Sequence, residues 1–321
     1  MTSQPSQVRL PTVTSTRGSG ELVPASRASI WLALASVYVI WGSTYLAIRV
    51  AVRTMPPMLM AGARFVVAGA LLYLVAERRG DRVADRPGIA QWRAAAIVGG
   101  MLLCIGNGAV VWAEQHIPSG LTALLLAPSP VWTAIVERVF VGRRLGLQAT
   151  IGLVTGLAGL ALLFGRSSVG HADLVASVVV VVAAMSWAIG SVYARHAPLP
   201  KRPLVSTSMQ MLAGGAFLTL AGLLSGETAR LNIAAISVES WMAWAFLMVF
   251  GSLVAFSAYA WLLRVAPTSL ISTYSYVNPI VAVSLGWALL GEQVSASMIG
   301  AAAVIVIAVA LIVTARDPPP R

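Results

Sequence analysis

Charged residues are scarce in this chain of 321 residues. Asp, Glu, Lys and Arg make up 10% of it and hydrophobic residues 58%, whereas soluble domains carry about 25% charged residues. This composition excludes an ordinary water-soluble globular protein. Since one span needs about 20 apolar residues, the chain can supply ten spans from roughly 200 residues. The sequence therefore predicts a polytopic membrane protein.

Residues with reactive side chains are also few. The single cysteine, Cys104, excludes an intramolecular disulfide, and the single lysine, Lys201, does not lie in a nucleotide-binding P-loop. The three histidines lack metal-ligand spacing, and neither an HExxH nor a G-x-S-x-G pattern occurs. We therefore expect no catalytic residues, no cofactor and no metal, so that the protein is not an enzyme. An intramembrane enzyme with unusual groups stays open as a rival class.

The basic residues indicate a topology. A net charge of +11 would favour a nucleic-acid partner if it formed a surface patch, but the basic residues lie between apolar runs. With a cytoplasmic N-terminus, 17 of the 22 Lys and Arg residues fall inside, four fall outside and Arg64 lies within a span. The positive-inside rule then predicts that both termini are cytoplasmic. The expected partners are the lipid bilayer and a small-molecule substrate, with no nucleic acid; a monomer is compatible with the sequence, which sets no oligomeric state.

Ten apolar runs of helical length follow one another, with short polar or proline-marked breaks that require antiparallel neighbours. They predict an all-α polytopic membrane protein with ten transmembrane helices. Residues 1–28 contain no apolar core for a signal peptide and are expected to form a disordered cytoplasmic leader, and residues 315–321 a cytoplasmic tail. The runs cover residues 30–50, 57–76, 92–113, 118–140, 146–165, 172–194, 203–224, 240–263, 267–290 and 294–314.

The two halves of the chain repeat each other. Residues of the first half recur 149 positions later, and the segment 42–45 recurs 148 positions later as 190–193. Because each repeat holds five helices, the second copy must be inverted, as in secondary transporters with a substrate site near the membrane midplane. We expect a first repeat at residues 29–165 and a second at 166–314. The recurring positions are Pro118, Leu121, Pro130 and Gly142, then Pro267, Leu270, Pro279 and Gly291.

Prolines near the midplane of the fourth and ninth spans predict helix breaks at Pro128, Pro130 and Pro279. Since proline lacks an N–H, each frees the carbonyl four residues earlier. Such carbonyls need a hydroxyl, water or substrate as partner; static kinks satisfied by neighbouring side chains remain an equal alternative. Gly42 and Gly190 are candidate hinges in the first and sixth spans. The freed carbonyls belong to Leu124, Leu126 and Ser275.

Polar and aromatic residues around these breaks suit an amphipathic ligand, because amides and hydroxyls can bond carboxylates or amines and aromatic faces can hold apolar or cationic groups. The alternative is that the polar residues join helices and the aromatic ones anchor the protein at the membrane interface. The candidate substrate-binding residues are Trp41, Ser43, Thr44, Tyr45, Asn107, Trp187, Ser191, Tyr274, Tyr276 and Asn278.

Arg64 carries the only charge well inside a span, and intramembrane charges are functional candidates. It could attract a carboxylate or act as a structural brace, and both interpretations stay open. Glu114 and His116, at the outer end of the third span, are expected to be solvated. No Asp, Glu or His lies in the middle of a span, so strong proton coupling lacks an obvious carrier.

Several ordered motifs resemble the EamA-type members of the drug/metabolite transporter superfamily. The resemblance covers residues 30–314 and implies a bacterial-type inner-membrane exporter with two inverted five-helix repeats around a central cavity. It places Arg64 in the family's Arg-Phe position, which favours a structural or gating role. One departure is Gly142-Arg143, where the family commonly has the Gly-Glu that is kept at Gly291-Glu292. The motifs are Trp41-Gly42-Ser43-Thr44-Tyr45, Ala61 to Phe65, Gly106-Asn107-Gly108, Ala113-Glu114, Ser186 to Tyr193 and Tyr274 to Pro279.

Residues and resemblance together predict a secondary transporter that exports small amphipathic metabolites by alternating access at a midplane cavity. Among the superfamily's substrates, amino acids and especially aromatic ones are favoured by the resemblance. Fold-level analogy does not fix a substrate. The alternatives are an exporter of other drugs or metabolites without amino-acid activity, and a channel-like facilitator.

Overall fold

The computed structural model describes residues 14–16, 22–24, 26–78, 87–142, 146–165, 171–266, 268–271 and 273–315. Most of the expected leader and of the tail lies outside these residues, and so does Arg143. Two short strands before the first helix, β1 (Thr14–Thr16) and β2 (Leu22–Pro24), pair antiparallel. Everything else of regular structure in the described part of the chain is helical.

The first half crosses the bilayer five times. The first and second crossings are α1 (Arg27–Ala51) and α2 (Pro57–Arg78). The third joins α3 (Ile89–Gly99), the π-helical segment η1 (Gly100–Asn107) and α4 (Gly108–Ala113). The fourth comprises α5 (Ser119–Leu126), α6 (Ser129–Val136) and the π-helical η2 (Glu137–Val141), and the fifth is α7 (Leu147–Gly165).

The second half has the same order of crossings. The sixth and seventh are α8 (His171–His196) and α9 (Pro203–Leu224), followed by the short turns η3 (Glu227–Arg230) and η4 (Ile233–Ala235). The eighth joins α10 (Val238–Phe246), the π-helical η5 (Leu247–Ala255) and α11 (Phe256–Val265). The ninth comprises α12 (Thr268–Ile271) and α13 (Tyr274–Leu290), and the tenth is α14 (Ala296–Thr314).

These elements confirm the ten expected spans. Among the described residues, eight helical stretches are long and apolar enough to cross a membrane, and two shorter apolar helices at Leu147–Leu162 and Tyr274–Leu290 supply the others. The π-helical segments of the third and eighth crossings were not foreseen. π-Helical segments are rare and often occur at functional sites.

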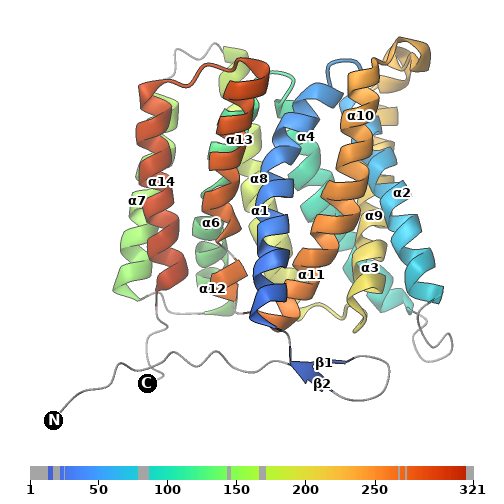
Figure 1. The fold of residues 1–321 in the computed structure, drawn as a ribbon, viewed down its shortest axis with the longest axis horizontal. Coiled ribbons are helices and arrows are strands. Elements are labelled where there is room, and N and C mark those ends of the chain that lie inside the picture. The colour runs from blue at the N-terminus through green and yellow to red at the C-terminus, as the bar shows by residue number, and fades with distance from the viewer. Residues whose placement is uncertain are drawn as a thin grey trace.

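Equivalent helices of the two halves pack against each other. Helix α2 lies along α9, and α7 lies along α14, at opposite ends of the molecule (Figure 1). The start of α1 and the end of α14 lie at the same membrane face (Figure 1). We name the opposite face, where α1 ends and α2 begins, the distal face. This arrangement is the inverted five-helix repeat expected from the sequence.

Glycines let α2 and α9 meet backbone to backbone. A Cβ atom on Gly215 would lie 2.8 Å from the main-chain nitrogen of Val66, and one on Gly62 would lie 2.8 Å from that of Thr219. Small residues of this kind provide close packing where lipid offers no hydrophobic driving force between helices. Large apolar side chains such as Leu74 and Trp287 are instead exposed on the outer surface of the bundle, where lipid would surround them.

Two carboxylates cap helix N-termini at the distal face. Glu292 accepts hydrogen bonds from the main-chain N–H groups of Ser119 (2.9 Å) and Gly120 (3.1 Å) and from the Ser119 hydroxyl (2.9 Å). Glu227 accepts bonds from the N–H groups of Met58 (3.1 Å) and Leu59 (2.9 Å). A negative charge satisfies the free N–H groups of a helix start and its dipole. The residue equivalent to Glu292 in the first repeat is Arg143, and a guanidinium group cannot accept hydrogen bonds.

Candidate functional site

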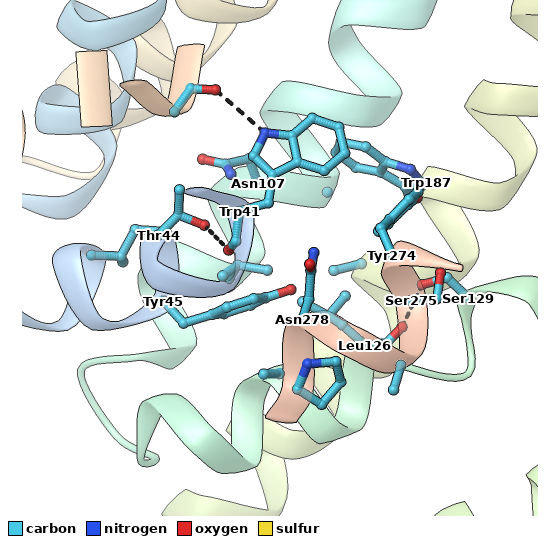
Figure 2. A pocket seen from close by; sticks show the side chains of 18 of the residues that line it. Trp41, Thr44, Tyr45, Asn107, Leu126, Ser129, Trp187, Tyr274, Ser275 and Asn278 are labelled. Carbon is cyan, nitrogen blue, oxygen red and sulfur yellow. Dashed lines mark hydrogen bonds between the residues drawn. The ribbon is translucent and has the colours of Figure 1, made fainter. Parts of the chain in front are cut away.

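A central cavity lies between the two halves of the molecule. Its empty space is about 870 Å³, a volume that includes open solvent at the mouth of the cavity. Side chains from the first, second, third, fourth, sixth, eighth and ninth crossings line it (Figure 2). Both repeats thus contribute to one site, as the inverted-repeat architecture predicts.

Aromatic rings gathered around Trp41 form one wall of the cavity. The Trp41 ring makes edge-on contacts with Trp187, Phe256 and Tyr274, at centroid separations of 6.4, 5.4 and 5.4 Å. Its indole N–H donates to the carbonyl of Gly251 (3.3 Å). Such contacts hold the ring in a single orientation, and T-shaped pairs stabilise by about 0.5–1.5 kcal/mol beyond burial. The cavity therefore offers a fixed aromatic surface to a ligand.

Polar side chains share the cavity with these rings. Tyr45 and Asn278 point into the same space from α1 and α13 (Figure 2). With its amide nitrogen facing the main chain, Asn278 donates to the carbonyls of Tyr38 (3.1 Å) and Tyr274 (3.3 Å). Thr44 donates its hydroxyl to the carbonyl of Trp41 (2.6 Å). Asn278 thus connects α1 with α13 and lines the cavity at the same time.

Arg64 lies in the cavity wall with 4% of its surface exposed. One terminal nitrogen donates to the side-chain oxygen of Asn107 (3.0 Å), and the guanidinium lies 4.1 Å from the centre of the Phe65 ring. Its Nε has no hydrogen-bond partner among the described residues. A buried donor without a partner is costly, so the guanidinium can serve as a brace and still offer an N–H to an anion. Its role remains a prediction.

The fourth crossing is broken near the midplane, where α5 ends at Leu126 and α6 begins at Ser129. The Ser129 hydroxyl donates to the Leu126 carbonyl, which is one of the carbonyls that the prolines free. In the ninth crossing the break lies between α12 and α13, before Pro279, and Pro279 itself lies inside α13. The ninth helix is therefore interrupted, but not at the proline.

Gly42 and Gly190 lie inside continuous helices, at points where another helix comes very close. A Cβ on Gly42 would be 2.6 Å from the Cβ of Val281, and one on Gly190 would be 2.9 Å from the Cβ of Met101. The two repeat-related glycines thus permit close packing at equivalent places. Their role as hinges remains a prediction.

The structure brings seven of the ten candidate binding residues to the cavity and leaves three outside its lining. Of these three, Ser43 donates its hydroxyl to the carbonyl of Ile40 (2.9 Å) in its own helix. Tyr276 packs against a separate apolar cluster that includes Leu124 and Ile305. Ser191 is half-buried on α8. The seven lining residues are Trp41, Thr44, Tyr45, Asn107, Trp187, Tyr274 and Asn278.

The contribution of the eighth crossing was missed. Gly251 and Phe256 line the cavity, yet no polar motif marks them. The repeat offset could have found Phe256, because position 107 shifted by 149 is 256; it does not find Gly251. The same shift relates two further pairs that line the cavity, Ser129 with Asn278 and Leu126 with Ser275.

The expectation that Glu114 is solvated is wrong. Its side chain is fully buried at the distal end of the third crossing, where Arg49 of α1 donates to the main-chain carbonyl of Glu114. His116 is exposed, as expected, and its ring lies 4.5 Å from that of Trp112. At the opposite face, Glu137 forms an ion pair with Arg195 (2.9 Å) that joins the fourth and sixth crossings.

Comparisons with known proteins agree with this architecture. The EamA-like transporter family matches twice, at residues 27–165 and 174–314. The "Uncharacterized inner membrane transporter YedA" of Escherichia coli K12 is 37% identical over 281 residues, which cover 87% of this chain and 89% of that protein. The "Uncharacterized transporter YvbV" of Bacillus subtilis 168 is 22% identical over 91% of this chain and 93% of its own.

A solved crystal structure shares the fold, with a TM-score of 0.63 and 22% identity over 89% of this chain and 96% of its own. The double family match spans both repeats, and the cavity lies between them. This chain belongs to the EamA-like transporter family of the drug/metabolite transporter superfamily, and it is a membrane transporter.

Proposed function

We propose that the protein exports small amphipathic metabolites, and that amino acids with aromatic side chains are its preferred substrates. The observation that carries this proposal is the cavity itself, in which a fixed aromatic wall around Trp41 stands near a buried guanidinium and two amides. An apolar pocket with a few convergent polar groups is the usual form of a small-molecule site.

The chemistry of the lining suits a zwitterion with an aromatic ring. The carboxylate would accept hydrogen bonds from Arg64, whose Nε lacks a partner among the described residues, and charged hydrogen bonds of this kind are the strong ones. The ammonium would face ring surfaces and amide or carbonyl oxygens. The substrate ring would stack on Trp41 and its neighbours. A purely apolar drug would leave Arg64 without a counter-charge.

The transport cycle follows from the repeats. Two halves related by an inverted repeat can rock about a site at their interface and open it to either face in turn. The excess of Lys and Arg predicts that the distal face is extracytoplasmic and that both termini are cytoplasmic. The name of the YedA relative supports the bacterial inner membrane as the location. We propose outward transport by analogy with the family's exporters.

Counterflow into liposomes that contain the purified protein tests the substrate class. Radiolabelled phenylalanine and tryptophan should exchange saturably, and threonine more weakly. Trp41→Ala should raise the half-saturating concentration about tenfold, which corresponds to about 1.4 kcal/mol and is within the range of one or two aromatic contacts. Trp287→Ala, at a lipid-facing position with 65% exposure, is the matched control and should behave as the unmutated protein does.

Other outcomes would separate the alternatives. Absence of exchange for all three amino acids would refute the amino-acid assignment and would direct the search to other metabolites. Flux that does not saturate would indicate a channel-like facilitator. Equal effects of Trp41→Ala and Trp287→Ala would remove the aromatic wall from the site.

A further inference from the structure

Glu114 has a buried carboxyl group that does not line the central cavity. It directly follows α4 at the distal face, and its side chain is 0% exposed. Neither carboxyl oxygen has a hydrogen-bond partner among the described residues. An ionised carboxylate in such a place loses its hydration, and the charge of Arg49 compensates for this loss only in part, so the neutral acid is favoured.

Among the described residues, none of the charged and titratable groups around Glu114 forms a hydrogen bond or an ion pair with its carboxyl group. From α1, Arg49 directs its guanidinium at the main-chain carbonyl of Glu114 and not at its carboxyl group. From the segment between α13 and α14, Glu292 adds a like charge and is itself bound to the start of α5. Tyr45 on α1 lies within electrostatic range. His116 nearby is exposed and packs on Trp112.

The balance of these effects has a clear direction. Burial raises the pKa of the Glu114 carboxyl well above its usual range; the positive charge of Arg49 opposes this shift, and the negative charge of Glu292 adds to it. The neutral form is therefore tied to the closed packing seen here, in which Ala113, Ile117 and Ser119 around it are also buried. Separation of the distal helix ends would admit water and favour the charged form.

The position also connects the distal face with the cavity. Helix α1 carries Arg49 and Tyr45 one turn apart, and Tyr45 lines the cavity. Glu114 directly follows the third crossing, which carries Asn107 in the cavity wall. Any movement of α1 against the third crossing therefore changes the environment of the carboxyl group and of the substrate site together.

This carboxyl group breaks the symmetry of the repeats. Shifts of 148 and 149 positions from Glu114 lead to Leu262 and Leu263, which cannot bind a proton. The scaffold is thus symmetric between the two faces, whereas this titratable group exists at the distal face alone. A proton taken up here would act on one half of the cycle and not on the other.

We propose that Glu114 is a proton-binding site that must be filled for the distal end of the carrier to close. On closing, the carboxylate takes a proton from distal water and becomes a neutral acid; on opening, the acid O–H bond breaks and the proton returns to water. Proton binding and closure are then linked, because the closed state binds the proton more tightly. The transport assay of this inference rests on the proposed function, whereas the spectroscopic assay does not.

The first experiment needs no substrate. Infrared spectra of the purified protein in lipid near neutral pH should contain the carbonyl stretch of a protonated carboxylic acid. The difference between the spectra of the unmutated protein and of Glu114→Gln should contain this band, because the substitution removes the acid. Glu239→Gln, at an exposed carboxyl group of the same face, is the matched control and should keep it. Identical bands in all three proteins would overturn the proposal, whatever the protein transports.

The second experiment measures counterflow as a function of pH. Exchange by the unmutated protein should fall as pH rises, by up to about tenfold per pH unit for a single required proton. Glu114→Gln, which resembles the neutral acid, should exchange at the rate of the unmutated protein at acidic pH and should no longer depend on pH. Retention of the pH dependence in Glu114→Gln, or its absence in the unmutated protein, would overturn the proposal.

Discussion

The contact between α3 and α9 allows a sharp test of how closely these helices pack. A Cβ atom added to Gly99 would lie 2.3 Å from the main-chain oxygen of Gln210 and 3.0 Å from the nitrogen of Gly214. Both neighbours are backbone atoms of α9, so no side chain can rotate out of the way. At the next position, a Cβ on Gly100 would meet only the Phe217 ring at 3.5 Å, which is an ordinary contact.

These distances set the expected sizes of the effects. A carbon atom approaches a carbonyl oxygen to about 3.3–3.6 Å at best, so Gly99→Ala must push the two helices apart by about 1 Å. Overpacking of this kind costs about 1–3 kcal/mol. Gly100→Ala introduces no clash and should be neutral or stabilising by up to about 1 kcal/mol, because alanine has a higher helix propensity than glycine.

Reversible unfolding in mixed micelles of a mild detergent and dodecyl sulfate, followed by tryptophan fluorescence, measures the free energy of unfolding of both variants. Gly99→Ala should lower it and Gly100→Ala should not. Equal values for the two variants would refute the claim that α3 and α9 are in backbone contact at Gly99. A loss in Gly100→Ala alone would mean that α9 packs closely against Gly100 and not against Gly99.

Other expected outcomes concern caps, protonation and binding. Glu227→Gln should destabilise the protein by about 1–3 kcal/mol, because it weakens charged hydrogen bonds to the start of α2; thermal melting measures this, and Glu239→Gln should leave the melting temperature unchanged. The pKa of Glu114 is raised in the folded state, so its contribution to stability is complete at acidic pH and is lost as pH rises through that pKa. The melting temperature of the unmutated protein should therefore fall as pH rises. The same fall in Glu114→Gln would contradict this. Asn278→Ala should weaken substrate exchange with folded protein still obtained, whereas Tyr276→Ala should not, and loss of exchange in Tyr276→Ala alone would contradict the observed lining.

The tertiary structure sorted residues that look alike in the sequence. Tyr274 and Tyr276 stand two positions apart in one motif, yet only Tyr274 reaches the cavity, because two steps along a helix turn a side chain through more than half a circle. Phe256 carries no polar signal, yet it lines the cavity at the start of α11, directly after the π-helical segment η5. Helix rotation depends on neighbours far away in the chain.

The sequence by itself determined the number of crossings, the two repeats and the family. These properties depend on the length of apolar runs, on short ordered motifs and on an offset of 148–149 residues, all of which are local or periodic. Only the tertiary structure decided that Glu292 caps α5, that Arg64 contacts Asn107 and that Glu114 is buried without a partner among the described residues. Each of these facts depends on how segments distant in the chain pack together, and packing sets both burial and hydrogen bonding.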